Sequence, residues 1–191
     1  KYGGFETLAE NLSIFLSKKG HHVTVFCSGK SAESNYKGVE LNYIRLKPNR
    51  FQGILYDLIA LKISLNSHDK ILMLGSPAGP FLSLFPGLKN KLYFNFGGLD
   101  FHRNKWSAFV RKFIEFGKIN AIKNSKHVIA DNNGIKDYII KNYHIHSEKI
   151  HVIEYGGDHA KIIGHRKQSN ELNFIKKPYC LTVARIQKDN N

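Results

Sequence analysis

The spacing of apolar residues along the chain predicts strands and helices in alternation. Leu8, Leu12, Phe15 and Leu16 recur at i, i+4, i+7 and i+8, which predicts a helix over about 7–19 that ends at Gly20. The same spacing predicts helices at 53–65 and 134–143, a short helix at 80–85 and a long one that ends near 124. Apolar runs predict strands at 22–28, 39–46, 70–74, 91–96, 127–130 and 150–153, and the polar stretch 31–37 predicts a turn.

This order of elements predicts an α/β fold with a doubly wound parallel sheet. Short apolar strands such as 70–74 are typical of parallel sheets that are covered on both faces. In such a sheet the ligand lies outside the carboxyl ends of the strands. We therefore expect the loops that follow the strands to carry the functional residues.

The same pattern divides the chain into one domain and the start of another. Residues 1–158 form the first domain, and the polar stretch 159–177 predicts an interdomain linker. The segment 178–185 predicts a fresh strand, so 178–191 would begin a second domain. No apolar strand precedes Tyr2. We therefore expect a fragment that is truncated at both ends and lacks the first strand of its sheet.

Composition and charge narrow the choice of partners. The chain has 191 residues, 42% of them hydrophobic, which is enough to bury a core. Its 29 Lys and Arg against 15 Asp and Glu give a formal charge of +14, which attracts anionic partners. No helix-turn-helix, RNP, zinc or KH pattern accompanies this charge, so we expect no nucleic acid partner. Cys27 and Cys180 lie in predicted strands as small apolar groups, which fits a reducing cytoplasm.

The long helix combines apolar and basic residues. Two interpretations fit: a core stripe with a solvated basic face, or a helix that lies on an anionic membrane. No run of eighteen apolar residues predicts a membrane span. The apolar members are Trp106, Phe109, Val110, Phe113, Ile114 and Phe116, and the basic ones are Arg103, Lys105, Arg111, Lys112, Lys118 and Lys123.

Gly3 and Gly4 directly precede the first predicted helix. A glycine pair at a helix N-terminus exposes backbone N–H groups at the positive end of the helix, which suggests a phosphate site. Neither G-x-G-x-x-G nor G-x-x-x-x-G-K-[ST] is present there, which disfavours a Rossmann oxidoreductase. Three later loops, at 97–103, 131–133 and 155–158, follow predicted strands. We expect the glycine pair to share one crevice with them.

Four segments, 1–7, 98–107, 129–139 and 155–158, carry a family resemblance. Together they resemble the DUF1972 branch of retaining family 4 glycosyltransferases, which are often labelled rhamnosyltransferases of bacterial surface polysaccharides. The resemblance spans nearly the whole chain. It implies a Rossmann-like N-terminal, acceptor-side domain of the two-domain GT-B fold. It also implies transfer of a hexose or deoxyhexose, such as rhamnose, from a nucleotide-diphosphate sugar to a lipid-linked glycan.

On the donor side, the resemblance implies that Gly3 and Gly4 approach the donor pyrophosphate. Arg185 would bind the donor phosphate, with Lys188 assisting. A loop close to the hinge would join the two domains. Its residues are Tyr155, Gly156, Gly157 and Asp158.

On the acceptor side, Asp100 and His102 are the candidate catalytic residues, since they would line the acceptor pocket and a carboxylate there can orient a sugar hydroxyl. Arg103 would meet the lipid-linked phosphate of the acceptor. The family usually has Asp-Gly-Leu-Glu-Trp in this loop, so Gly97 replaces an Asp and Asp100 becomes the loop's only carboxylate. The remaining candidate acceptor-binding residues are Glu6, Asp131 and Asn132.

The resemblance also implies the setting of the reaction. The leaving phosphate would take the acceptor proton, and no metal or cofactor is expected because the nucleotide sugar is a substrate. We expect a cytoplasmic protein that is peripheral at the inner face of the membrane, and a fragment that is inactive by itself. The alternative is a non-enzymatic basic α/β module that binds anionic membrane or RNA through the long helix.

Overall fold

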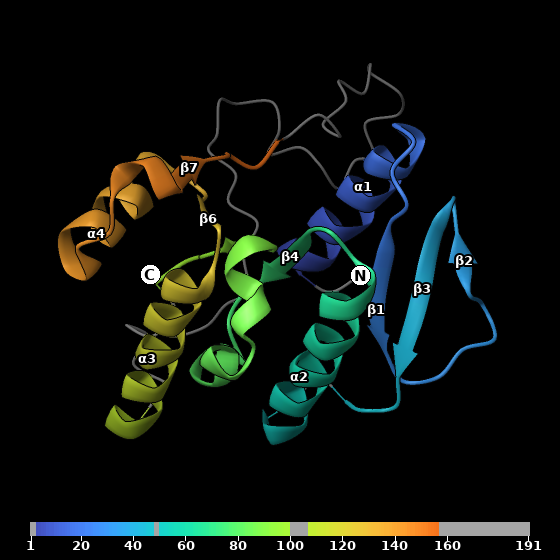
Figure 1. Ribbon diagram of the computed structural model, residues 1–191, viewed down its shortest axis with the longest axis horizontal. Coiled ribbons are helices and arrows are strands. Elements are labelled where there is room, and N and C mark those ends of the chain that lie inside the picture. Colours follow the sequence, from blue (N-terminus) through green and yellow to red (C-terminus); the bar gives the residue numbers. More distant parts are fainter. Residues whose placement is uncertain (1–2, 48–49, 100–106, 157–191) are drawn as a thin grey trace, which may run out of the picture.

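The computed structural model of the chain describes residues 3–47, 50–99 and 107–156, in which helices and strands alternate (Figure 1). This order confirms the predicted α/β fold class. In chain order the elements are α1 (Gly4–Lys18), β1 (Thr24–Ser28), β2 (Asn35–Tyr36), β3 (Val39–Ile44), α2 (Arg50–Ser67), β4 (Ile71–Leu74), η1 (Gly79–Leu84), η2 (Pro86–Asn90), β5 (Leu92–Asn95), α3 (Ala108–Asn124), β6 (His127–Ala130), α4 (Asn133–Tyr143), η4 (Ser147–Lys149) and β7 (Ile150–Val152).

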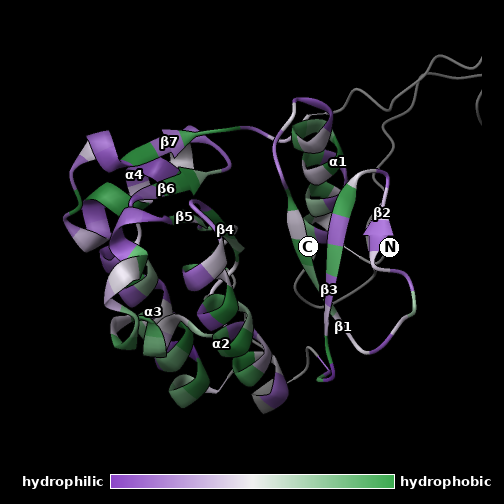
Figure 2. Cartoon of the chain, turned by 45° about the vertical axis from the view of Figure 1, so that its right-hand side comes forward, coloured by the Kyte–Doolittle hydropathy of each residue, from purple (hydrophilic) through white to green (hydrophobic). Residues whose placement is uncertain are grey.

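The described strands form two sheets (Figure 2). The larger sheet has the order β4-β5-β6-β7 and is parallel throughout, with Ile71 opposite Leu92 and Val128 opposite Ile150. The smaller sheet has the order β1-β3-β2, in which β1 and β3 are parallel and β2 is antiparallel to β3. Parallel strands joined by helices are the doubly wound arrangement that the sequence predicts.

Strand β2 corrects the prediction of a turn over 31–37. Lys37 and Gly38 have φ angles of 51° and 85°, and they join β2 to β3 as a two-residue hairpin. Positive φ at both central positions is typical of the type I′ turn, whose usual sequence signal is Asn-Gly or Asp-Gly. Lys-Gly lacks that signal, so the sequence pattern does not reveal the hairpin.

Helix α1 lies against the smaller sheet. The Ser17 hydroxyl donates to the Gly38 carbonyl at 2.8 Å, and the Tyr36 hydroxyl donates to Glu10 Oε1 at 3.1 Å. Contacts with β1 and β3 complete this packing. The first helix is therefore fixed to the strands that follow it in the chain.

The main core lies on one face of the larger sheet. Strand residues Phe94 and Val128 are fully buried there, together with Ile122 of α3 and Ile139 of α4. Helix α3 and η1 pack backbone to backbone, because a Cβ at Gly79 would overlap the Gly117 carbonyl oxygen. The helix predicted at 80–85 is thus present as the 3-10 helix η1, and the short η2 after it was not predicted.

The buried face of α3 differs from the predicted apolar stripe. Phe109 and Phe116 are 80% and 56% exposed, whereas Lys118, which the sequence pattern placed among the solvated basic residues, is 4% exposed. The close contact between α3 and η1 explains the difference, since it turns the small residues around Gly117 inward. Within the described helices, none is long and apolar enough to cross a membrane.

Candidate functional site

The start of α1 lies at the carboxyl ends of β4 and β5. Gly3 is the N-cap of α1 and Gly4 its first residue, so the helix begins three positions earlier than predicted. The ring of Phe5 lies against both following loops: a Cβ at Gly97 would be 3.1 Å from its Cζ, and one at Gly75 would be 3.6 Å from its Cε2. Gly97 and Gly75 have φ angles of +63° and +82°, which residues with a side chain rarely adopt. The helix start that follows the glycine pair therefore lies against the loops after β4 and β5, and the second of these is the start of the predicted site loop 97–103.

Glu6 folds back over this helix start. Its Oε2 lies 2.6 Å from the position that a Cβ at Gly3 would take. Glu6 is the third residue of α1, where a carboxylate interacts favourably with the free N–H groups and the positive end of the helix. A Cβ at Gly4 would meet nothing within 4 Å, so the surface over that residue is open. A phosphate that approached these amides would therefore find the Glu6 carboxylate beside Gly3 and an open surface over Gly4.

A buried amide connects the ends of three strands. Asn95 ends β5 and is 4% exposed, and its Oδ1 accepts a hydrogen bond from Gly97 N at 2.9 Å. Its side chain also hydrogen-bonds Asp131, which follows β6, and Tyr155, which follows β7. Asp131 and Tyr155 were predicted from the sequence, whereas Asn95 was not. A polar residue that ends the otherwise apolar strand 92–95 is the signal that could have found it.

Asp131 has capacity left for a ligand. Its Oδ1 is buried without a hydrogen-bond partner among the residues that the structure describes. Burial raises the pKa of this carboxyl, against the opposing effects of the Asn95 hydrogen bond and the positive charge of Lys118. Burial, then the negative charge of Asp131, raises the pKa of Tyr155. An unsatisfied buried oxygen calls for a donor, and a ligand hydroxyl can supply one.

Lys118 fixes the start of the loop after β5. Its Nζ donates to the carbonyls of Phe96 at 2.9 Å and Gly98 at 2.5 Å, and it lies 4.0 Å from the centroid of the Phe96 ring. The sequence does carry a signal for this inward position. Lys118 is four residues after Ile114 and three before Ala121, which is the spacing of one helix face.

A second carboxyl, Asp57 of α2, holds the loop after β4. It accepts a hydrogen bond from the backbone of Ala78, and burial raises its pKa to about 6. Burial also raises the pKa of its neighbour Tyr56, with Cys27 and Asp57 adding to the effect. Cys27 is a free, half-buried thiol whose pKa burial raises. Asp57 was not predicted, because its hydrogen-bond partner Ala78 lies more than twenty positions away in the sequence.

The structure places some of the other predicted residues. Asn132 is the N-cap of α4, and its Oδ1 accepts from Ile135 N at 2.9 Å, so this oxygen is engaged within the helix. Gly156 is exposed beside Tyr155. The remaining predicted site residues lie outside the described residues: Asp100, His102, Arg103, Gly157, Asp158, Arg185 and Lys188. Over 3–47, 50–99 and 107–156, no group of three or more His, Cys, Asp or Glu side chains could hold a metal ion.

A comparison with known protein families identifies a match that includes the residues described above. The family described as "Domain of unknown function (DUF1972)" matches residues 1–158. The chain belongs to the DUF1972 family. The matched part of this DUF1972 chain includes the glycine pair, Asn95, Lys118 and Asp131, whereas 159–191 lie beyond it. No curated protein matches the sequence.

Proposed function

We propose that this DUF1972 domain is the acceptor-side half of a retaining family 4 glycosyltransferase with the GT-B fold. It transfers a hexose or deoxyhexose, with rhamnose a candidate, from a nucleotide-diphosphate sugar to a lipid-linked glycan. One observation carries the proposal: Phe5 brings the glycine-rich start of α1 against the loops after β4 and β5. A helix N-terminus at the carboxyl edge of a parallel sheet is suited to bind a phosphate group.

The neighbouring side chains suit a sugar. The unsatisfied oxygen of Asp131 can accept a hydrogen bond from a hydroxyl, and Tyr155 lies within the same hydrogen-bonded cluster. Asn95 and Lys118 hold the surrounding loops in place through buried hydrogen bonds. In the proposed reaction the leaving phosphate takes the acceptor proton, so Asp131 orients the hydroxyl and acts as a positioning residue.

The assay measures donor binding and nucleotide-diphosphate release by the natural gene product, with a panel of UDP-, GDP- and dTDP-sugars and isolated membranes as the acceptor source. We expect one donor class to bind saturably. The Gly4→Val variant tests the helix start, because a Cβ there has no neighbour within 4 Å and the substitution leaves the fold intact. We expect at least a tenfold weaker donor affinity, roughly 1.4 kcal/mol.

Ala108→Val is the matched control, since Ala108 is likewise the exposed first residue of a helix, that of α3, and lies outside the predicted site loops. Its donor affinity should equal that of the unchanged protein. Equal affinities for Gly4→Val and the unchanged protein would remove the helix start from the site. A gene product that binds no donor of the panel would refute the proposed function.

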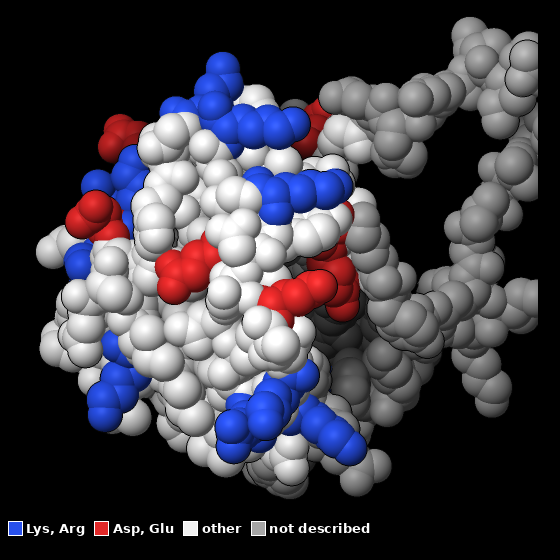
Figure 3. Space-filling model, turned by 90° about the vertical axis from the view of Figure 1, so that its right-hand side faces the viewer, with Lys and Arg blue, Asp and Glu red and all other residues white. Residues whose placement is uncertain are grey.

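A non-enzymatic role at an anionic membrane is the second candidate. The exposed rings of Phe109 and Phe116 lie on α3 with the exposed basic residues Arg111, Lys112 and Lys123. Apolar rings among basic side chains suit a lipid surface better than RNA. On the face that includes β2 and β3, acidic side chains lie between basic ones, so no single basic patch covers that face (Figure 3). Salt-sensitive binding to phosphatidylglycerol vesicles without a saturable nucleotide-sugar site would favour this role.

A further inference from the structure

The face of the larger sheet that turns away from the main core carries a row of rings. Side chains alternate between the two faces of a strand, and Val128 and Ile150 point into the core. Their neighbours His127 and His151 therefore lie on the opposite face. The centroid of the His127 ring is 4.8 Å from that of the His151 ring and 5.1 Å from that of the Tyr93 ring. The row thus crosses β5, β6 and β7.

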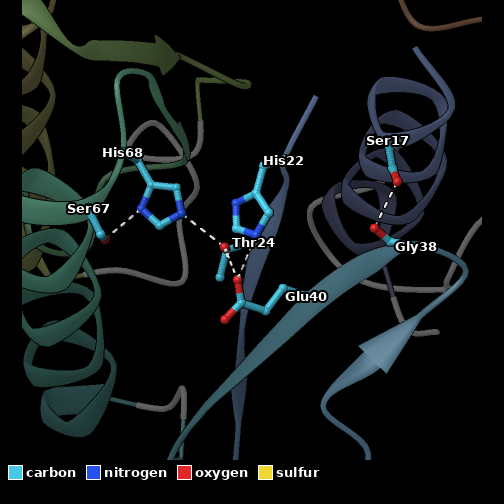
Figure 4. Close-up of polar contacts among 7 residues, drawn as sticks. All are labelled: Ser17, His22, Thr24, Gly38, Glu40, Ser67 and His68. Atoms are coloured by element: carbon cyan, nitrogen blue, oxygen red, sulfur yellow. Dashed lines mark hydrogen bonds and ion pairs between the residues drawn. The ribbon is translucent and has the colours of Figure 1, made fainter. Parts of the chain in front are cut away.

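The two imidazoles of this row contact each other through their nitrogens. Nε2 of His151 lies 2.9 Å from Nδ1 of His127, and His151 is exposed whereas His127 is half-buried. Among the described residues, no other two histidines are joined in this way. The ring nitrogens of His68, for comparison, contact the hydroxyl groups of Ser67 and Thr24 (Figure 4). The contact between His127 and His151 is therefore a distinct feature of this sheet face.

The surroundings of the pair favour the neutral form of His127. Burial, then the charges of His151, Lys126 and Lys149, lower the pKa of His127. A hydrogen bond between two neutral imidazoles uses one N–H group and one lone pair. When the donor ring moves its proton to its other nitrogen, both nitrogens of the contact carry lone pairs. Neutral imidazole nitrogens of this kind are the commonest metal ligands in proteins.

The separation of the two nitrogens fits a metal ion that is bound to both. Two metal–nitrogen bonds of about 2.0–2.1 Å that meet at about 90° place the nitrogens about 2.9 Å apart, whereas a tetrahedral angle needs about 3.3 Å. The observed 2.9 Å thus matches the square-planar arrangement that is typical of Cu²⁺ and Ni²⁺. Convergence of both lone pairs on the ion requires one ring to rotate, and His151 is the exposed one.

The space beside the pair suits the rest of such a site. A hollow of about 300 Å³ is lined by the two histidines together with Tyr93, Ile129 and Ile153. A water molecule takes about 30 Å³ in the liquid, so this hollow has room for the water ligands that complete the coordination of the ion.

We propose that the imidazoles of His127 and His151 chelate one Cu²⁺ or Ni²⁺ ion, with water at its remaining positions. The ion binds Nδ1 of His127 and Nε2 of His151, and it joins β6 to β7. Lys126 and Lys149 bring positive charge near the pair, so a cation held by charge alone, such as Mg²⁺, is disfavoured. The site therefore selects a metal that forms strong bonds to imidazole.

Titration of the natural gene product with CuCl₂ or NiCl₂ by calorimetry, after removal of metals with a chelator, tests the proposal. We expect a binding event that weakens at least about tenfold in His127→Gln and in His151→Gln, because each variant keeps only one imidazole ligand. MgCl₂ should give no such event. The matched control replaces His21 and His146 by glutamine together. Both are exposed, so this variant removes two imidazoles outside the pair and should keep the affinity of the unchanged protein.

Electron paramagnetic resonance of the Cu²⁺ complex counts its nitrogen ligands. We expect couplings from two imidazole nitrogens in the unchanged protein and from one in either single variant. Circular dichroism before the titration establishes that each variant is folded. Equal affinities for His127→Gln, His151→Gln and the unchanged protein would overturn the proposal, as would loss of binding in the control variant. A loss in only one of the two single variants would mean that one imidazole binds the ion alone, which would refute chelation by the pair.

Discussion

Replacement of Asp57 by asparagine should remove the fall in the free energy of unfolding that the buried carboxyl causes as pH rises. Asp57 accepts a hydrogen bond from the Ala78 backbone, and burial raises its pKa to about 6 from an ordinary value of 3.8. Between these two values the folded state binds more protons than the unfolded state, so the free energy of unfolding falls as pH rises. The asparagine side chain would keep an acceptor for Ala78 and remove the buried charge. We therefore expect Asp57→Asn to be more stable than the unchanged chain above about pH 6.

The magnitude follows from the two pKa values of Asp57. At 1.36 kcal/mol for each pKa unit, the buried carboxylate costs about 3 kcal/mol once the pH is well above 6. About 1 kcal/mol of this is already present near pH 4.5, because the carboxyl in the unfolded chain is then largely ionised. The difference between variant and unchanged chain should accordingly grow by about 2 kcal/mol between about pH 4.5 and pH 8.

Urea unfolding at several pH values, followed by circular dichroism, measures this difference. Asp69→Asn is the control, since Asp69 is exposed in the loop before β4 and its replacement removes the same charge without removing a buried carboxyl. The Asp57→Asn curve should diverge from the unchanged chain with rising pH. Curves for Asp57→Asn and the unchanged chain that stay parallel from pH 4.5 to 8 would refute the reasoning.

Substitutions at three further positions test the packing of the site, each by urea unfolding. Gly97→Ala should lower the free energy of unfolding by about 1–2 kcal/mol, because φ is positive there and the new methyl group would press on Phe5; an unchanged midpoint would contradict that contact. Lys118→Met should cost about 2 kcal/mol or more, since two carbonyls lose their donor, and a neutral result would mean that water replaces it. Asn132→Ala should cost about 1 kcal/mol and Asn132→Asp much less, because only the first removes the cap of α4; equal losses would exclude capping as the cause.

Most of the fold could be predicted because the local spacing of apolar residues indicates its helices and strands. In the run 71–74 the alternate residues Ile71 and Met73 are buried in the core on the larger sheet, and the helical spacing of the apolar residues over 7–19 predicted the presence of α1. Element boundaries were less accurate, as at the early start of α1 at Gly4. The β2–β3 hairpin could not be predicted because it depends on two backbone conformations that Lys37 and Gly38 do not signal.

Residues of the candidate site could be predicted only where their local position in the sequence indicates a role. Gly3 and Gly4 stand out because two adjacent glycines precede a helix, and Asp131 because it follows a predicted strand. Lys118 and Asn95 did not stand out, because their roles depend on loops from other parts of the chain that only the folded sheet brings to them. Sequence spacing records which face a residue occupies, but the partner on that face is a property of the tertiary structure.

The glycine pair is the point at which the Glu6 side chain and the proposed ligand meet. Gly3 and Gly4 begin α1 at the carboxyl ends of β4 and β5, which is where doubly wound sheets bind phosphate groups. In the described chain the Glu6 carboxylate lies over Gly3, so it and a phosphate would compete for one positive helix end. The donor affinity of Gly4→Val therefore tests whether the phosphate reaches this helix end.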